Sequence, residues 1–99
     1  MATHVVLMNW TDQGIKGFRE SPSRAEVGRE EMEKLGITLK DIYWTIGPYD
    51  LVLTVDAPDD EALAAALLRI GSAGNIRTTT LRAFSRDEFD RVSEKVRGA

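Results

Sequence analysis

The segment Gly47-Pro48-Tyr49-Asp50 holds the side chains best suited to binding or acting on a small ligand. A carboxylate accepts hydrogen bonds and serves as a base, and a phenol both donates and accepts. One interpretation places Tyr49 and Asp50 at the border of a pocket. The other is structural: Gly47 and Pro48 shape a turn, Tyr49 packs its ring, and Asp50 accepts backbone N–H bonds where a strand begins. The sequence leaves both interpretations open.

Arg77 is the second candidate, because a guanidinium fork matches a carboxylate in shape and charge. It lies in a polar, threonine-rich segment, residues 75–84, that also carries Arg82. Alternation along a strand puts these two arginines on opposite faces. Arg77 is therefore a hypothetical partner for Asp50 or for an anionic ligand. The alternative is an edge strand whose arginines are solvated.

Aromatic residues supply the apolar area that a planar or apolar ligand would need. They are Trp10, Tyr43, Trp44 and Tyr49. These rings suit a pocket, but they equally suit a core or a subunit contact. Tyr43 joins Tyr49, Asp50 and Arg77 as the expected ligand-binding residues.

The sequence assigns no catalytic residue and predicts no metal site and no cofactor. His4 is the only histidine and cysteine is absent, which excludes a histidine- or thiolate-rich metal site within one chain. No Gly-x-Ser-x-Gly elbow surrounds a serine. The acidic residues of 56–61 lack calcium-loop spacing, and the start of a helix explains them.

Composition narrows the class of protein further. A chain of 99 residues is expected to form a single domain over residues 1–99. The net charge of -3, with both signs interspersed, disfavours nucleic-acid binding. No stretch approaches the roughly 20 apolar residues of a membrane helix, and no export signal opens the chain. Without cysteine, a cytoplasmic location is the expectation.

Hydrophobic periodicity predicts the order β-α-β-β-α-β followed by one more helix. Ser21-Pro22 and Pro58 mark helix starts, and Ser85 and Glu88 have capping-box spacing before a third helix. This third helix has Phe89, Val92 and Val96 as its expected buried stripe. The expected strands cover residues 3–10, 37–46, 49–55 and 75–84, with a possible bulge at 40–41, and the expected helices begin near 21, 58 and 85.

These elements predict an α+β, ferredoxin-like fold, in which a four-stranded antiparallel sheet has both helices on one face. Leu51, Leu53 and Val55 are expected on the helix side. The open side would carry Asp50, Val52 and Thr54 with Tyr43, Thr45, Val6 and Met8. Such a face is too apolar for water, so we expect a homodimer or larger homo-oligomer. The terminal helix would cover its own sheet or reach a partner.

Several motifs are spread along nearly the whole sequence. They are Asn9 to Gly14, Ser21-Pro22, Tyr43-Trp44-Thr45, Gly47-Pro48-Tyr49-Asp50, residues 57–61 and residues 74–84. In these motifs the chain resembles the GYD domain family of small bacterial and archaeal proteins. His4 and Trp10 depart from the family pattern, standing where an aromatic residue and a phenylalanine are expected. The resemblance implies a fold of the dimeric α/β barrel type, and no settled activity.

Two functions remain open at this point. The first is a non-catalytic, homo-oligomeric module that binds a small apolar ligand or serves assembly. The second is a small dimeric α/β-barrel enzyme acting on a hydrophobic aromatic or quinone-like substrate, which rests on analogy of fold. The first is favoured, because no second catalytic group accompanies Tyr49, Asp50 and His4.

Overall fold

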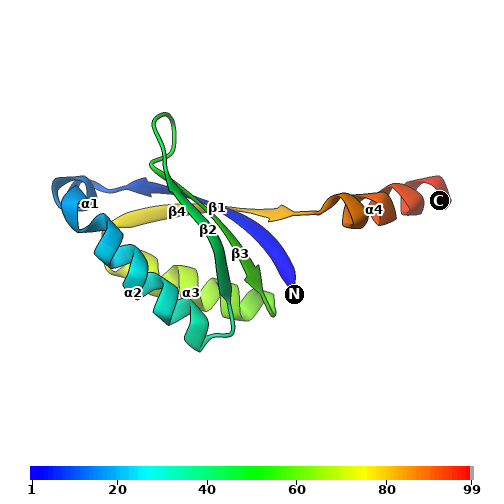
Figure 1. Cartoon of the computed structure of the whole chain (residues 1–99), viewed down its shortest axis with the longest axis horizontal. Coiled ribbons are helices and arrows are strands. Elements are labelled where there is room, and N and C mark those ends of the chain that lie inside the picture. The colour runs from blue at the N-terminus through cyan, green and yellow to red at the C-terminus, as the bar shows by residue number, and fades with distance from the viewer. Residues whose placement is uncertain (99) are drawn as a thin grey trace.

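The protein is a four-stranded antiparallel sheet with two long helices on one face and a third helix that leaves the body (Figure 1). The computed structural model describes residues 1–98. The sheet order is β2-β3-β1-β4, so β1 is central, as its continuous apolar sequence predicts. The strands are β1 (Ala2–Trp10), β2 (Thr38–Trp44), β3 (Leu51–Ala57) and β4 (Ile76–Ala83). The helices are α1 (Asp12–Lys16), the 3-10 turn η1 (Phe18–Glu20), α2 (Ser21–Lys34), α3 (Asp60–Ser72) and α4 (Arg86–Gly98).

The order of these elements confirms the predicted ferredoxin-like α+β fold. α2 packs against β2, and α3 packs against β3 and β4. The core lies between these helices and one face of the sheet. Its fully buried side chains include Val6, Ile37 and Val55. No helix within residues 1–98 is long and apolar enough to cross a membrane.

Helix boundaries follow the local signals in the sequence. Pro22 lies in the first turn of α2. Gly36, with φ +78°, follows the last turn of α2 and terminates the helix. Asp59 caps α3 through a hydrogen bond of 2.7 Å that its side chain accepts from the backbone N–H of Ala62. This cap confirms the structural explanation of the acidic residues there.

The helix α1 lies in a polar segment, residues 11–20, for which the sequence predicts neither a helix nor a strand. Its N-cap is Thr11, whose hydroxyl accepts from the backbone N–H of Gly14. Gly14 is buried, and a Cβ built on it would lie 1.9 Å from the backbone oxygen of Asn75. The close approach of α1 to the start of β4 therefore requires glycine at this position.

The open face of the sheet differs from the prediction at β1. Val6 and Met8 lie opposite Leu53 and Leu51, and all are buried on the helix side. Residues that face each other across an antiparallel pair share a face, so the prediction of Val6 and Met8 on the open side is wrong. The half-buried Val5 and Leu7, Val52, Thr54 and Tyr43, with Thr79 and Leu81 of β4, form the open face.

The predicted bulge in β2 is present. The pairing of β2 with β3 shifts register between Leu39 and Asp41, which leaves Lys40 as the extra residue. Beyond the bulge, Tyr43 lies opposite Val52 on the open face. The connection from β2 to β3 then forms a loop that rises away from the sheet in Figure 1.

Helix α4 extends away from the body at the C-terminal end of β4 (Figure 1). This extension accounts for the elongated overall dimensions of 52 × 31 × 18 Å. No described residue of α4 is buried. Phe89, Val92 and Val96, expected as a buried stripe, are exposed in the single chain. The helix does not cover its own sheet.

Candidate functional site

The Gly47-Pro48-Tyr49-Asp50 turn is held by backbone contacts at its base. Gly47 has φ +138°, a conformation that favours glycine, and its site is open on all sides. The hydroxyl of Thr45 donates to the carbonyl of Tyr49 at 2.6 Å, and the backbone N–H of Thr45 donates to the carbonyl of Asp50 at 2.8 Å. Ile46, the next residue of the loop after Thr45, is fully exposed.

Asp50 joins the turn to the central strand. Its backbone N–H donates to the carbonyl of Met8 at 2.8 Å. Its carboxylate accepts from the backbone N–H of Trp10 at 2.9 Å. Asp50 therefore completes the hydrogen bonding at the end of β1, which is the structural role that the sequence allowed for it.

The predicted pair of Arg77 and Asp50 does not form among the described residues. Arg77 lies on the edge strand β4 opposite Asn9, exposed, while the Asp50 carboxylate contacts Trp10. Arg77 borders a small pocket of about 300 Å³ between α3 and β4. Tyr43 is 62% exposed on the open face, opposite Val52. Of the four predicted ligand-binding residues, only Arg77 borders this small pocket.

His4 lies at the other end of β1 from Asp50. It is buried on the helix side opposite Val55, and its Nδ1 has no hydrogen-bond partner within residues 1–98. Asp50 contacts Met8 and Trp10, which are four to six residues further along β1, so roughly 13–20 Å separates the two positions. They do not form an acid–base pair.

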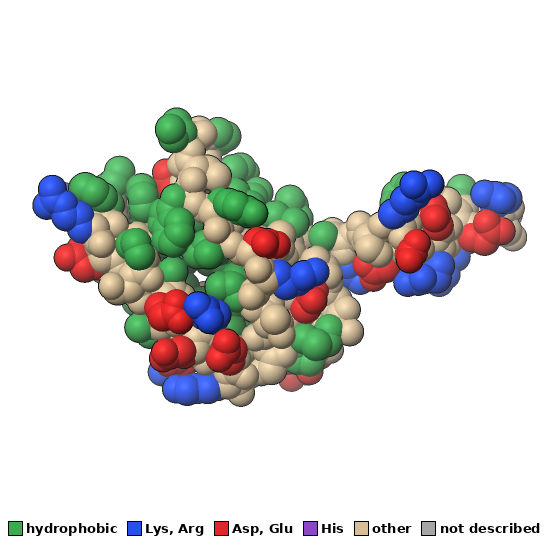
Figure 2. Space-filling view, viewed as in Figure 1, with side chains coloured by type: hydrophobic (Ala, Val, Ile, Leu, Met, Phe, Trp, Pro, Cys, Tyr) green, Lys and Arg blue, Asp and Glu red, His purple; other side chains and the backbone are tan. Residues whose placement is uncertain are grey.

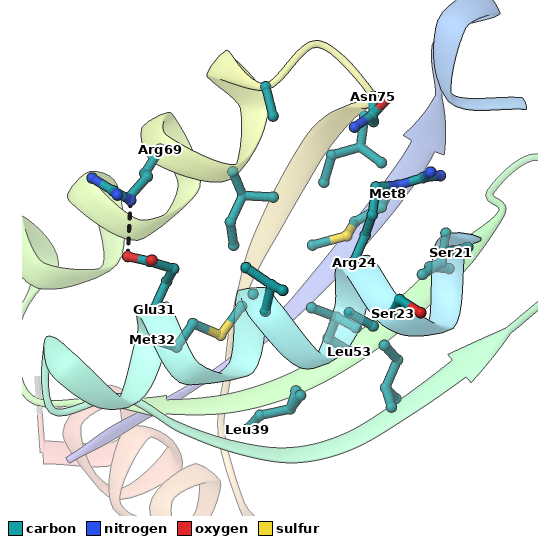
Figure 3. A pocket seen from close by; sticks show the side chains of 18 of the residues that line it. Met8, Ser21, Ser23, Arg24, Glu31, Met32, Leu39, Leu53, Arg69 and Asn75 are labelled. Carbon is teal, nitrogen blue, oxygen red and sulfur yellow. Dashed lines mark ion pairs between the residues drawn. The ribbon is translucent and has the colours of Figure 1, made fainter. Parts of the chain in front are cut away.

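The principal pocket lies on the helix side of the sheet, where the sequence predicts none. It measures about 720 Å³ and sits between α2, α3 and the sheet (Figure 3). We call it the helix-side pocket. Its sheet residues are mainly apolar: Met8, Trp10, Leu39, Ile42, Leu51, Leu53 and Ile76. Its helix residues include Ser21, Arg24, Ala25, Gly28, Glu31, Met32, Arg69 and Ile70.

Small residues of α2 border this space, and the two helices meet beside it. α2 presents the small residues Ala25 and Gly28 to it, and a Cβ built on Gly28 would meet Ile70 of α3 at 3.8 Å, an ordinary contact. The helices also meet through the ion pair of Glu31 and Arg69, at 2.8 Å. Small residues in an apolar stripe are the signal by which sequence reasoning would have found the pocket.

The polar groups of the helix-side pocket lie toward its two ends. The Arg24 guanidinium donates to the carbonyls of Gly17 and Gly14 at 2.9 and 3.3 Å. The hydroxyl of Ser21 accepts from the Trp44 indole at 2.9 Å. Figure 3 shows Arg24, Ser21 and Asn75 toward one end and the Glu31–Arg69 pair toward the other.

No group of three or more His, Cys, Asp or Glu residues within residues 1–98 is placed to hold a metal ion. The pocket on the helix side instead combines apolar walls with hydrogen-bond donors, which suits an organic ligand.

Comparison with solved structures shows the same fold in other proteins. The feast or famine regulatory protein from M. tuberculosis, complexed with L-methionine, matches with a TM-score of 0.65 at 22% identity. The match covers 86% of this chain, which spans 51% of that protein. TTHA0845 from Thermus thermophilus matches with a TM-score of 0.55 at 30% identity, over 86% of this chain and 95% of that chain.

Comparison of sequences assigns the family. A Thermus thermophilus protein named "Glutamine synthetase and cystathionine beta-lyase binding protein" is 36% identical over 84 residues, which are 84% of this chain and 88% of the relative. The family model described as the GYD domain matches residues 4–92 of this chain. That match includes the motif at residues 47–50 and both β-α-β halves. The chain belongs to the GYD domain family.

Proposed function

We propose that this chain is a non-catalytic binding module that associates with itself through the open face of its sheet and, once assembled, binds another protein. The observation that carries the proposal is the uncovered apolar surface of the single chain. It comprises the open face, Ile46 of the 45–50 loop and the stripe of α4. Figure 2 shows hydrophobic side chains over the body and charged ones crowding α4.

The open face supports self-association because its apolar residues are contiguous. Val5 and Leu7 of the central strand lie opposite Thr54 and Val52 on one side and Leu81 and Thr79 on the other. Leu81 is 49% exposed and Tyr43 is 62% exposed. A second copy presents the same face, so two copies related by a two-fold axis would bury both open faces against each other.

Helix α4 supports the same conclusion from a different element. Phe89, Val92 and Val96 follow steps of three and four residues and so form one stripe. Phe89 is 58% and Val96 75% exposed, because the helix leaves the body. An amphipathic helix without cover in its own chain is suited to packing on a second copy.

The second partner is suggested by a relative. The Thermus thermophilus protein, 36% identical, is named for binding glutamine synthetase and cystathionine beta-lyase. We propose that this chain likewise binds a metabolic enzyme of its host, with glutamine synthetase as the first one to test. The exposed Ile46 is the contact we expect, because the loop carries it away from the surface of the sheet.

Self-association is tested by measuring the mass in solution with light scattering and native mass spectrometry. We expect a dimer or larger assembly for the natural chain and a monomer for Leu81→Asp, which puts a charge on the open face. Leu68→Asp is the matched control, since Leu68 is 73% exposed on α3, on the other side of the sheet. A monomeric natural chain at tens of micromolar, or equal masses for both variants, contradicts the proposal.

Enzyme binding is tested with glutamine synthetase purified from the same host on a biosensor surface. We expect saturable binding by the natural chain and at least about a tenfold loss for Ile46→Asp, because a charge replaces a central apolar contact. Thr38→Asp, on an exposed part of β2, is the control. Equal affinity of the natural chain and Ile46→Asp would show that the contact lies elsewhere. Absence of binding by the natural chain would exclude glutamine synthetase as the partner.

A further inference from the structure

We propose that the helix-side pocket binds an apolar monocarboxylate, a molecule with one carboxylate on an aliphatic or aromatic body. The pocket lies between α2, α3 and the sheet, opposite the face that the proposed assembly uses. The inference therefore goes beyond the proposed assembly and does not depend on it.

The walls of the pocket determine the body of the ligand. A volume of about 720 Å³ lies within the range of sites for small organic molecules, about 300–1,000 Å³. Met8 and Met32 line it, and methionine side chains adapt their shape to irregular apolar groups. Leu51, Leu53 and Ile70 complete an apolar surface that gains free energy from contact with hydrocarbon instead of water.

The donors at the α1 end determine the head group. Arg24 uses two N–H groups on the carbonyls of Gly14 and Gly17, which leaves further donors on its guanidinium. Among the ion pairs within residues 1–98, none includes Arg24, although Glu20 also lines the pocket. Donors without acceptors favour an anionic oxygen.

The other end of the pocket excludes a second anionic group. The Arg69 guanidinium is engaged by the Glu31 carboxylate at 2.8 Å, as the dashed line in Figure 3 marks. Because Arg69 is already paired, this end of the pocket, as lined by residues 1–98, offers no unpaired cation to a second carboxylate. Among the described residues, an arginine without an acidic partner at one end and a neutralised pair toward the other therefore select a single carboxylate.

The inference is tested by calorimetric titration of the full chain with octanoate, decanoate and dodecanoate, and with the corresponding primary alcohols. We expect the affinity to rise about fourfold per added methylene as hydrocarbon enters the pocket. Arg24→Gln is expected to lower the affinity for the carboxylates by about tenfold or more, and the affinity for the alcohols by less than about twofold. Arg29→Gln, on the same helix but paired with Glu26, is the matched control.

A second variant tests whether the ligand binds in this pocket. Ala25→Phe fills it from α2 and is expected to abolish binding of acids and alcohols, with circular dichroism and the melting temperature confirming the fold. Three results would overturn the inference: no binding at millimolar concentration, unchanged binding by folded Ala25→Phe, or equal losses for acid and alcohol in Arg24→Gln. The mass in solution, measured on the same samples, shows separately whether the proposed assembly fails.

Discussion

At the scale of single residues, Asp50 links the turn to the end of the central strand. Its carboxylate accepts a hydrogen bond from the backbone N–H of Trp10, and its backbone N–H donates to the carbonyl of Met8, both in β1. The sequence allowed this role and a ligand-binding role, and the hydrogen bonds support the first. The carboxylate of the family motif thus holds the loop that carries Ile46 in a defined position.

Replacement of Asp50 tests this role. Asp50→Ala leaves the backbone N–H of Trp10 without its acceptor, so we expect the free energy of unfolding to fall by about 1–3 kcal/mol. Asp50→Asn keeps an oxygen at the same position and is expected to lose less than half as much. Denaturant titrations of the three proteins measure the difference. Equal stability of Asp50→Ala and the natural chain would show that water replaces the carboxylate at no cost.

At the scale of elements, α4 begins with a capping box, as the spacing of Ser85 and Glu88 predicts. The backbone N–H of Ser85 donates to the Glu88 carboxylate at 2.9 Å, and the backbone N–H of Glu88 donates to the Ser85 hydroxyl at 3.2 Å. Arg82 adds an ion pair with Glu88 at 3.4 Å. These contacts define where α4 begins, while its apolar stripe remains uncovered.

The capping box makes the start of α4 sensitive to acid. The backbone N–H of Ser85, with a smaller contribution from Arg82, holds the pKa of Glu88 below its ordinary value of 4.5. A lowered pKa in the folded state means that the stabilisation is complete above 4.5 and is lost as the pH falls through the lowered folded value. We expect the amide resonance of Ser85 to shift and the first turn of α4 to fray in that acidic range.

Glu88→Gln is the control for this titration. The amide oxygen still accepts from Ser85 but does not ionise. The Ser85 resonance should therefore lose its dependence on pH in this variant. A dependence that persists in Glu88→Gln would assign the titration to another group.

At the scale of the whole molecule, the two faces of the sheet have different tasks. The helix side holds the core and the helix-side pocket, and the open side has no cover within residues 1–98. If assembly covers the open side, folding and association are linked. We expect the melting temperature to rise by several degrees when the protein concentration is raised about a hundredfold.

Leu81→Asp should abolish this dependence on concentration, because the variant is expected to stay monomeric. Leu68→Asp, on the helix side, should retain it. Scanning calorimetry over the concentration series measures both. A melting temperature of the natural chain that is constant over the series would show that the monomer is the folding unit.

Local signals in the sequence determine most of the elements. Apolar alternation in β3, the proline near the start of α2, the glycine after it, and the Ser85–Glu88 box act within a few residues, so they predict where elements begin and end. The bulge at Lys40 and the central place of β1 also follow from local polarity and from a continuous apolar run. The match to the GYD family, over residues 4–92, spans these same segments.

Only the tertiary structure decided the faces and the sites. Both faces of β1 are apolar, so alternation does not show which one meets the helices; the pairing of Val6 with Leu53 does. The direction of α4, the separation of Arg77 from Asp50 and the gap between α2 and α3 likewise depend on contacts between distant segments. Local propensity carries no information about such distances, because they are set by how whole elements pack.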